Sequence, residues 1–366
     1  MSKKQLNILH IGYCPNNQSS GVAVAIPGHL IHQAQQEFLN IGFLNLCSEK
    51  NPKLNDINVF LYKDYSTIKS LPNGFNYPDL IVFHELYRPQ FIKLSSEAKK
   101  SNIPYVIIPH GGLTKEAQSQ KKLKKWLGNK LLFNKYIYAA KAIQFLSPSE
   151  KERSKRFIKK QSIIISGNGI DFPKIRYKTH NPLKITFIGR YDVYFKGLDL
   201  LLQAIKKIIN DLKKENISIQ LYGIGNEKDE EYIKNYILEN NIEEVCKMHG
   251  PVFRKEKENV LRETDVFIQP SRSEGQPLGI IEALAYGIPI IITPGTGLAT
   301  DAQKYNFGIT SKFNVDMLST AILNTIKNKS ELTNMSKNGR KYAEEHYSWN
   351  IIIEQLLVEY CKLIRR

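Results

Sequence analysis

Residues 266–285 read VFIQPSRSEGQPLGIIEALA, and this stretch decides the fold of the chain. The apolar run Val266–Gln269 has the length of a buried strand and ends at Pro270. A loop with glycine and proline follows, and an apolar helical pattern covers Leu278–Ala285. The stretch therefore predicts a strand, a loop and a helix, which is the repeating unit of a parallel α/β sheet.

The same alternation extends on both sides of this unit and runs twice along the chain. In the first half it predicts strands at Gln5–Ile11, Ile41–Leu46, Ile57–Leu61, Leu80–Phe83, Tyr105–Ile108, Ile143–Leu146 and Ser162–Ile165. In the second half it predicts strands at Lys184–Ile188, Ile217–Tyr222, Val245–His249, Val266–Gln269 and Ile288–Thr293. Helical patterns include Pro89–Ser101, Pro148–Lys159, Leu198–Lys213, Lys228–Glu239, Leu278–Ala285 and Trp349–Ile364. Because the strands are apolar throughout, we expect two doubly wound, Rossmann-like parallel sheets with both faces covered.

A chain of 366 residues is long enough for two domains. The stretch 171–182 holds two prolines and few apolar residues and precedes a strong strand, which is typical of a linker. We expect a first domain at 1–175 and a second at 176–348. The apolar residues of Trp349–Ile364 keep helical spacing, so this terminal helix is expected to cross back to the first domain.

Composition favours a cytoplasmic protein. No apolar run approaches the roughly 18 residues of a membrane span, and Met1 to Ile8 lacks the sustained apolar stretch of a signal peptide. The four cysteines form no CxxC pair, so a metal ribbon is not indicated and free thiols in a reducing compartment are expected. These thiols are Cys14, Cys47, Cys246 and Cys361.

Charge is distributed unevenly along the chain. Residues 1–175 carry 25 Lys and Arg against 11 Asp and Glu, a net charge of +14, whereas the remainder carries +3. A basic half suits nucleic acid, an anionic membrane or a phosphorylated substrate. A lysine-rich genome is the alternative, but it does not explain why only one half is unbalanced.

Ligands of open parallel sheets bind outside the carboxyl ends of the strands, so the loops there are the candidate site. Arg190 and Lys196 follow one strand and suit a diphosphate, although two solvated surface cations are the alternative. Glu274 and Glu282 flank the start of the helix at Leu278, whose free N–H groups suit a phosphate. Together they suit a sugar–diphosphate–ribose ligand, while a loop acid and a helix-dipole residue are the alternative.

The first loop, Gly12 to Gly21, is glycine-containing but is not GxGxxG, so a dinucleotide fingerprint fails there. Ser19, Ser20 and Gly21 come at a predicted helix start and offer backbone N–H groups to an anion. A simple N-cap with a loop is the alternative interpretation.

The string Glu274-x7-Glu282, followed by Ala-x-Ala-x-Gly-x-Pro, resembles the signature of family 4 glycosyltransferases. These are retaining enzymes of the GT-B fold, in which two Rossmann-like domains face across a cleft. The resemblance covers nearly the whole chain, and it departs from the family at Gln276 and Ser20. Further matching motifs are Ser20-Gly21, Pro109-His110-Gly111-Gly112, Ser147 to Glu150, Asn168 to Asp171, Gly189-Arg190, Lys196-Gly197 and Tyr222 to Gly225.

The resemblance implies roles for individual residues. Glu274 would hold hydroxyls of the donor sugar, Glu282 the ribose diol, and His110 would approach the transferred sugar from the first domain. The implied catalytic residues are Glu274, His110, Arg190 and Lys196. The implied donor-binding residues are Gly21, Arg190, Lys196, Gly223, Glu274, Gln276, Pro277, Leu278, Gly279 and Glu282.

The implied reaction is transfer of a hexose from a nucleoside-diphosphate sugar, with UDP as the family's usual nucleotide, to a saccharide acceptor. Cations and a helix N-terminus stabilise the negative charge that develops on the leaving diphosphate. We therefore expect neither a metal ion nor another cofactor. Retention without a nucleophile implies that the acceptor attacks from the leaving-group side and that the phosphate takes its proton.

Residues 115–135 carry seven lysines and one acid, interleaved with leucines and Trp126. A basic amphipathic segment of this kind is typical of peripheral binding to an anionic membrane, and a solvated helix face is the alternative. The candidate membrane residues are Lys121, Lys122, Lys124, Lys125 and Trp126. With a membrane face, the expected acceptor is polyprenyl-linked and the product is a capsule, exopolysaccharide or O-antigen.

Remaining signals are weaker. His84 and Glu85 follow a strand, so we interpret them as candidate acceptor contacts. His29 and His32 lack a third ligand nearby and are not interpreted as a metal site. A sugar-nucleotide epimerase of the same fold is the alternative enzyme, and nucleic-acid binding is disfavoured because no recognised motif is present.

Overall fold

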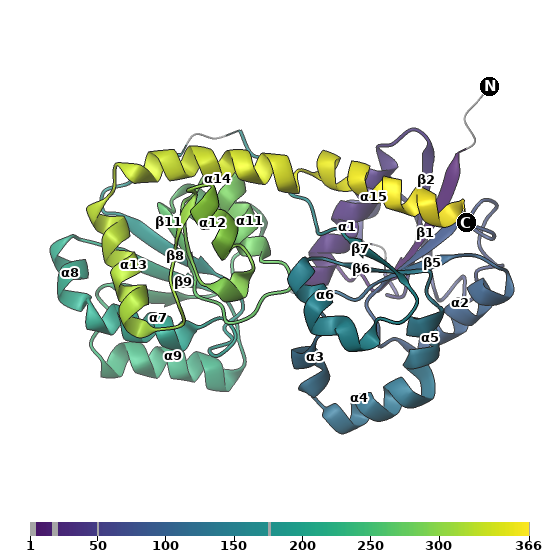
Figure 1. Ribbon diagram of the computed structural model, residues 1–366, viewed down its shortest axis with the longest axis horizontal. Coiled ribbons are helices and arrows are strands. Elements are labelled where there is room, and N and C mark those ends of the chain that lie inside the picture. The colour runs from purple at the N-terminus through teal and green to yellow at the C-terminus, as the bar shows by residue number, and fades with distance from the viewer. Residues whose placement is uncertain (1–4, 17–20, 50, 175–176, 366) are drawn as a thin grey trace. The chain divides into compact units, whose positions relative to one another are not determined.

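The computed structural model describes residues 5–16, 21–49, 51–174 and 177–365 (Figure 1). The chain divides into two compact units. The first unit is Met1–Gly169 with Trp349–Arg366, and the second unit is Ile170–Ser348. Each unit is built on one parallel sheet, so the prediction of two doubly wound α/β sheets is confirmed.

The first unit has a seven-stranded sheet whose order is β3-β2-β1-β4-β5-β6-β7. Its strands are β1 (Leu6–Gly12), β2 (Leu39–Asn45), β3 (Asn58–Leu61), β4 (Leu80–His84), β5 (Tyr105–Ile108), β6 (Ala142–Phe145) and β7 (Ser162–Ile165). Its helices are α1 (Gly21–Ala34), α2 (Pro89–Lys100), α3 (Lys115–Ser119), α4 (Lys122–Gly128), α5 (Asn134–Ala139), α6 (Pro148–Ser154) and α15 (Trp349–Ile364). Single turns lie at η1 (Pro52–Leu54), η2 (Asn129–Phe133) and η3 (Lys155–Phe157).

Neighbouring residues of these strands point to opposite faces and enter different cores. Leu9 of β1 packs with α2 and α5, whereas Ile8 packs with α1 and α15. Both residues are fully buried. The sheet is therefore covered on both faces, as its continuously apolar strands require.

The second unit has a six-stranded sheet whose order is β10-β9-β8-β11-β12-β13. Its strands are β8 (Lys184–Ile188), β9 (Ser218–Tyr222), β10 (Cys246–His249), β11 (Val266–Gln269), β12 (Ile290–Ile292) and β13 (Gly308–Thr310). Its helices are α7 (Leu198–Lys207), α8 (Ile209–Lys214), α9 (Glu227–Glu239), α10 (Arg254–Arg262), α11 (Leu278–Ala285), α12 (Ala299–Lys304), α13 (Val315–Lys327) and α14 (Glu331–Tyr347), with a turn at η4 (Pro294–Thr296).

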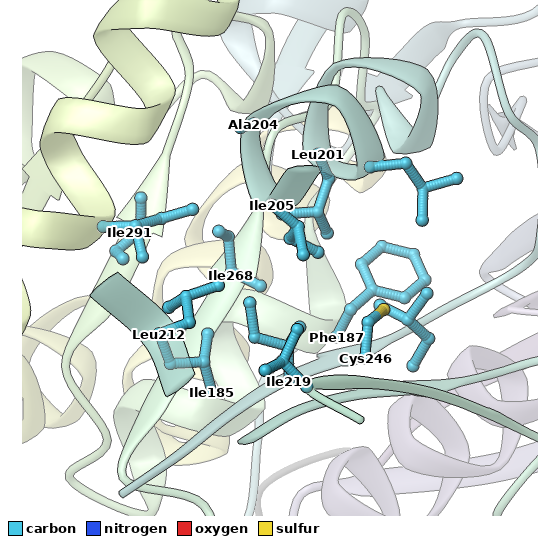
Figure 2. Close-up of a cluster of buried hydrophobic side chains, with 14 of the residues drawn as sticks. Ile185, Phe187, Leu201, Ala204, Ile205, Leu212, Ile219, Cys246, Ile268 and Ile291 are labelled. Atoms are coloured by element: carbon cyan, nitrogen blue, oxygen red, sulfur yellow. The ribbon is translucent and has the colours of Figure 1, made fainter. Parts of the chain in front are cut away.

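Figure 2 shows one face of this sheet, where Ile185, Phe187 and Ile219 lie against Leu201 and Ile205 of α7. Helices α8, α9 and α13 contribute to the same core. The other face is covered by α11, α12 and α14. The second unit thus repeats the two-faced packing of the first.

Most predicted elements lie within two residues of their observed bounds, and the larger differences are these. The helix expected at Pro148–Lys159 ends at Ser154, and residues 155–157 form the turn η3. The helix expected at Leu198–Lys213 is broken at Ile208, whose backbone is not helical. The strand β13 has only three residues, too short for a sequence signal. The helices from α12 to α14 were not predicted. No helix formed by the described residues is long and apolar enough to cross a bilayer.

Trp349 fixes the terminal helix α15 to the first unit. Its ring stacks on His32 at a centroid distance of 4.8 Å and meets the edge of His29 at 5.2 Å. A Cβ atom at Gly28 would lie 2.2 Å from this ring, and one at Gly169 would lie 2.5 Å from it. The two glycines therefore make the space that the indole occupies.

We expect Trp349→Ala to destabilise the first unit by about 3–5 kcal/mol, because a large buried ring leaves a cavity. Urea unfolding followed by circular dichroism measures the change. Val358→Ala, in the same helix but at an exposed position, is the matched control and should change stability by no more than about 0.5 kcal/mol. Equal effects of the two substitutions would contradict the anchoring role.

Candidate functional site

The strand order of the second unit reverses between β8 and β11, which are neighbours in the sheet although they are far apart in sequence. Ligands of open α/β sheets bind at such a switch point, outside the carboxyl ends of the strands. Arg190 and Lys196 lie in the loop after β8, and Glu274 lies in the loop after β11. The fold therefore brings the sequence-predicted residues of the second unit to one edge.

Glu274 is held by three donors. Its Oε1 accepts hydrogen bonds from Lys196 Nζ at 2.7 Å, Gln269 Nε2 at 2.5 Å and Ser271 Oγ at 2.6 Å. Its backbone N–H donates to the carbonyl of Gly295 at 2.9 Å. The Lys196 and Glu274 side chains are only 18% and 10% exposed, so this ion pair is partly desolvated and well oriented.

Close backbone contact sets the distance between the two loops. Gly197 has φ +69°, and a Cβ atom there would lie 2.1 Å from the carbonyl oxygen of Pro270. The N–H of Arg272 donates to the carbonyl of Phe195 at 2.9 Å. Only glycine fits at position 197, and this places the neighbouring Lys196 beside the β11 loop.

Arg272 forms a second connection between these loops, and this connection was not predicted from the sequence. Its guanidinium donates two hydrogen bonds of 2.7 Å to the carboxylate of Asp199 and lies over the ring of Tyr194. A bidentate ion pair of this type fixes the relative orientation of the two side chains as well as the distance between them. Asp199 lies in the first turn of α7, so the pair ties that helix to the β11 loop.

Helix α11 begins at Leu278 without a side-chain cap, because its N-cap residue is Pro277. Leu278 N–H donates to the carbonyl of Gln276, whereas no acceptor for the N–H of Gly279 is seen among the described residues. Glu282, one turn further, forms an ion pair with Lys257 of α10. The first turn of the helix thus has a backbone N–H without a described acceptor, and an acid lies nearby. This arrangement suits a phosphate beside a hydroxyl-bearing group.

Arg190 and Gly223, which the resemblance also assigns to donor binding, lie in surroundings different from those of Lys196. Arg190 is 70% exposed and pairs with Asp192 at 3.2 Å, so it is not fixed on the β11 loop. Gly223 is required for packing, because a Cβ there would lie 2.0 Å from the carbonyl oxygen of Gly189. Close approach of the β8 and β9 loops therefore explains this glycine, whatever its role in binding.

The switch point of the first unit, between β1 and β4, carries histidines. His10 Nδ1 lies 2.9 Å from His84 Nε2, and His84 Nδ1 lies 3.3 Å from His110 Nε2. His10 Nε2 lies 3.2 Å from the side-chain oxygen of Gln33 in α1. His10 and His84 are fully buried, and His110 is partly exposed.

This arrangement changes the role predicted for His84. Both of its ring nitrogens are bonded to other histidines, so it presents no polar atom to an acceptor. Glu85 has φ +79° and forms a 3.1 Å ion pair with Arg88, whose guanidinium lies over the ring of Tyr13. Glu85 and Arg88 are therefore the accessible polar groups after β4, and Arg88 was not predicted.

Of the residues predicted to bind an anion in the first loop, Gly21 begins α1, while Ser19 and Ser20 lie outside the described residues. Among the described residues, no group of three or more His, Cys, Asp or Glu side chains is arranged to hold a metal ion. The four cysteines, all described, are free thiols.

Two doubly wound sheets, the second with an edge suited to a phosphate, define an α/β protein with two Rossmann-like units, and it was compared with known proteins. Residues 171–342 match the family model described as glycosyl transferases group 1. The chain is 26% identical over 272 residues to the uncharacterized glycosyltransferase MJ1178 of Methanocaldococcus jannaschii, covering 74% of this chain and 72% of that one. These matches agree with the resemblance found in the sequence, and residues 171–342 are similar to the group 1 glycosyl transferases.

Two further similarities bear on fold and substrate. The chain is 26% identical over 311 residues to the Escherichia coli UDP-Gal:alpha-D-GlcNAc-diphosphoundecaprenol alpha-1,3-galactosyltransferase, covering 77% of this chain and 76% of that one. The structure of Anabaena Alr3699/HepE in complex with UDP and glucose superposes with a TM-score of 0.73. At 15% identity, with 98% of this chain and all of that one covered, this likeness confirms the GT-B fold.

The buried histidines make the stability of the first unit depend on pH. Burial lowers the pKa of His10 to about 3 and the pKa of His29 to about 4, from an unfolded value of about 6.5. Below pH 6.5 the unfolded chain therefore binds protons that the folded chain does not, and the free energy of unfolding falls as the pH falls toward 4.

We expect a loss of about 2 kcal/mol per histidine at pH 5. Tryptophan fluorescence during urea unfolding measures it in the first unit, because both tryptophans, Trp126 and Trp349, lie there. His29→Gln should make the dependence on pH shallower. An unchanged slope between pH 7 and pH 5 in the unsubstituted protein would contradict this prediction.

Proposed function

We propose that the protein is a retaining hexosyltransferase that moves a sugar from a nucleoside-diphosphate donor, UDP-sugar in the first instance, to a lipid-linked saccharide during surface-polysaccharide synthesis. The observation that carries this proposal is the Lys196–Glu274 pair beside the uncapped start of α11. The relative named above as a galactosyltransferase uses a UDP donor and a diphosphoundecaprenol-linked acceptor.

The sugar and the diphosphate of the donor would contact different residues of this site. Glu274, fixed through Oε1 by three donors, would accept hydrogen bonds from sugar hydroxyls. Lys196 would share its charge between Glu274 and the diphosphate, and the N–H of Gly279, for which no described residue is an acceptor, would bind the phosphate next to it. The N–H of Leu278 would join it by giving up its hydrogen bond to the Gln276 carbonyl. Glu282 would accept from the ribose diol, with Gln276 and Pro277 lining the same loop.

The bond that breaks joins the sugar carbon to the diphosphate oxygen, and its electron pair goes to that oxygen. The acceptor hydroxyl forms the new bond from the same side, which retains configuration, and its proton passes to the leaving diphosphate. Lys196 and Arg190 would stabilise the charge that develops there, so the proposed reaction uses side-chain cations in place of a metal ion. His110 is the proposed contact of the first unit with the transferred sugar.

Lys196→Ala should lower kcat/KM for sugar transfer by about 10²–10³, because it removes a preorganised charge from the leaving group. Glu282→Gln should raise the donor KM by about tenfold or more, since it weakens a charged hydrogen bond. Product formation is measured by mass spectrometry over a panel of nucleotide sugars. Lys206→Ala, an exposed lysine of α7, is the control and should transfer normally; normal turnover in both site variants would contradict the mechanism.

The membrane partner is proposed from α4 and η2. Helix α4 contributes no buried side chain to its unit, and its described apolar residues face solvent. Leu123 is 78% exposed, Trp126 49% and Leu131 61%, and Leu127 and Leu132 are similar. Lys121, Lys122 and Lys124 are exposed around them, whereas Lys125 bonds to the carbonyl of Ala117 and lies over the Tyr87 ring. Exposed leucines and a tryptophan among lysines fit an anionic membrane interface.

Replacing Lys121, Lys122 and Lys124 together by Gln should weaken binding to phosphatidylglycerol vesicles about hundredfold at low salt, at about 1 kcal/mol per lysine. Vesicle sedimentation measures the change. The charge-matched control replaces Lys206, Lys228 and Lys234, exposed lysines of the second unit. If both triple variants bind alike, or if the unsubstituted protein does not bind these vesicles, the membrane proposal fails.

The epimerase alternative gains no support. The matching family model and the relatives described above are glycosyltransferases, and an epimerase would not need the lysine-rich face of α4. Incubating the protein with UDP-sugar alone tests the alternative, because an epimerase converts the donor without an acceptor.

A further inference from the structure

A continuous row of side chains connects α1 to the loop after β5 through three imidazole rings. It runs from Gln33 through His10 and His84 to His110, with separations of 3.2, 2.9 and 3.3 Å. Successive rings are nearly parallel, with interplanar angles of 26° and 23°. Only His110, at the end of the row, is partly exposed.

The direction of the hydrogen bonds follows from the end at Gln33. In the structure the Gln33 amide turns its oxygen toward His10, and its Nε2 is buried with no described partner; in this orientation the oxygen accepts, so His10 Nε2 carries the proton in that bond. A neutral imidazole has one N–H, so His10 Nδ1 then accepts from His84 Nε2, and His84 Nδ1 accepts from His110 Nε2. His110 is left with an unprotonated Nδ1, and no described residue hydrogen-bonds to that atom.

Burial keeps the row neutral. It lowers the pKa of His10 and of His110 to about 3 and lowers that of His84 well below its usual value. A positive charge on His84 is disfavoured further by the neighbouring imidazoles, which are those of His10 and His110 in the row and that of His29 beside it. Protonating any one ring would also reverse or break the donor order at its neighbours.

The backbone at His110 is fixed separately. His110 has φ +47°, and the N–H of the next residue, Gly111, donates to the carboxylate of Glu150 at 2.5 Å. Glu150 is fully buried and also accepts from the N–H of Leu146 at 2.7 Å. Its burial raises its pKa, while the two backbone bonds oppose that shift. The ring of His110 is thus held through its side chain and its backbone.

We propose that Gln33, His10 and His84 are positioning residues that hold His110 in the Nε2–H tautomer, so that its Nδ1 accepts a hydrogen bond from a substrate hydroxyl. His110 then acts as a neutral acceptor and not as an acid. The inference rests on the proposed function only for the identity of the hydroxyl, which would belong to the sugar. The tautomer itself is a property of the protein without substrate.

The tautomer is measured by ¹⁵N NMR of the histidine rings in the full-length protein between pH 6 and pH 8. We expect His110 to show a protonated Nε2 and an unprotonated Nδ1 throughout. A protonated Nδ1, or an imidazolium, would overturn the proposal. This measurement needs no substrate, so its outcome stands apart from any failure of the proposed glycosyl transfer.

The decisive variant changes Gln33, at the end of the row opposite to His110. Gln33→Met removes the acceptor that sets the direction, and it lies two rings away from His110, so a second His110 tautomer should appear. The kcat of transfer should fall on the order of tenfold, as for loss of other outer partners of a functional histidine, while the donor KM is retained.

Gln35→Met, at an exposed position two residues along, is the control and should change neither. An unchanged His110 spectrum in Gln33→Met would show that the row does not govern the ring. His84→Gln, which keeps one donor and one acceptor, should retain the tautomer better than His84→Phe.

Discussion

The ion pair between Lys196 and Glu274 is the interaction on which the proposed chemistry depends. It joins loops that follow two different strands, and it forms only because the sheet order places β8 beside β11. Gly197 permits the close contact of these loops, and the Arg272–Asp199 pair reinforces it. The sheet therefore provides the position, and the loops provide the charge at the point where a leaving diphosphate would need it.

The two units use the same architecture for different electrostatic tasks. At the switch point of the second unit, an acid and a cation are partly exposed and ready to exchange partners with a ligand. At the switch point of the first unit, neutral imidazoles lie in a row, and two of the three are fully buried. A charged pair is suited to stabilising a developing charge, whereas a neutral row is suited to orienting hydroxyl groups without a net charge.

The strands and the main motif could be predicted because their signals are local. Val266–Gln269 and Leu278–Ala285 have the same bounds in the sequence analysis and in the structure, since Pro270 ends one and Pro277 precedes the other. The partners of the site residues were not predictable. Asp199 is 73 positions from Arg272, and Lys257 is 25 from Glu282, so only the folded sheet brings them together. His84 was misread as a ligand contact because a strand-end histidine looks alike in sequence whether it faces a ligand or another ring.

The first unit is built from two separate stretches of chain. Leu356 and Tyr360 of α15 are completely buried in its core, and the Tyr360 hydroxyl donates to Gln144 at 2.8 Å. The ribosome makes this helix after the whole of the second unit, which is one uninterrupted stretch. During synthesis the second unit can fold as soon as it emerges, whereas the first must wait, with one face of its sheet covered only in part, by α1, until α15 has left the exit tunnel.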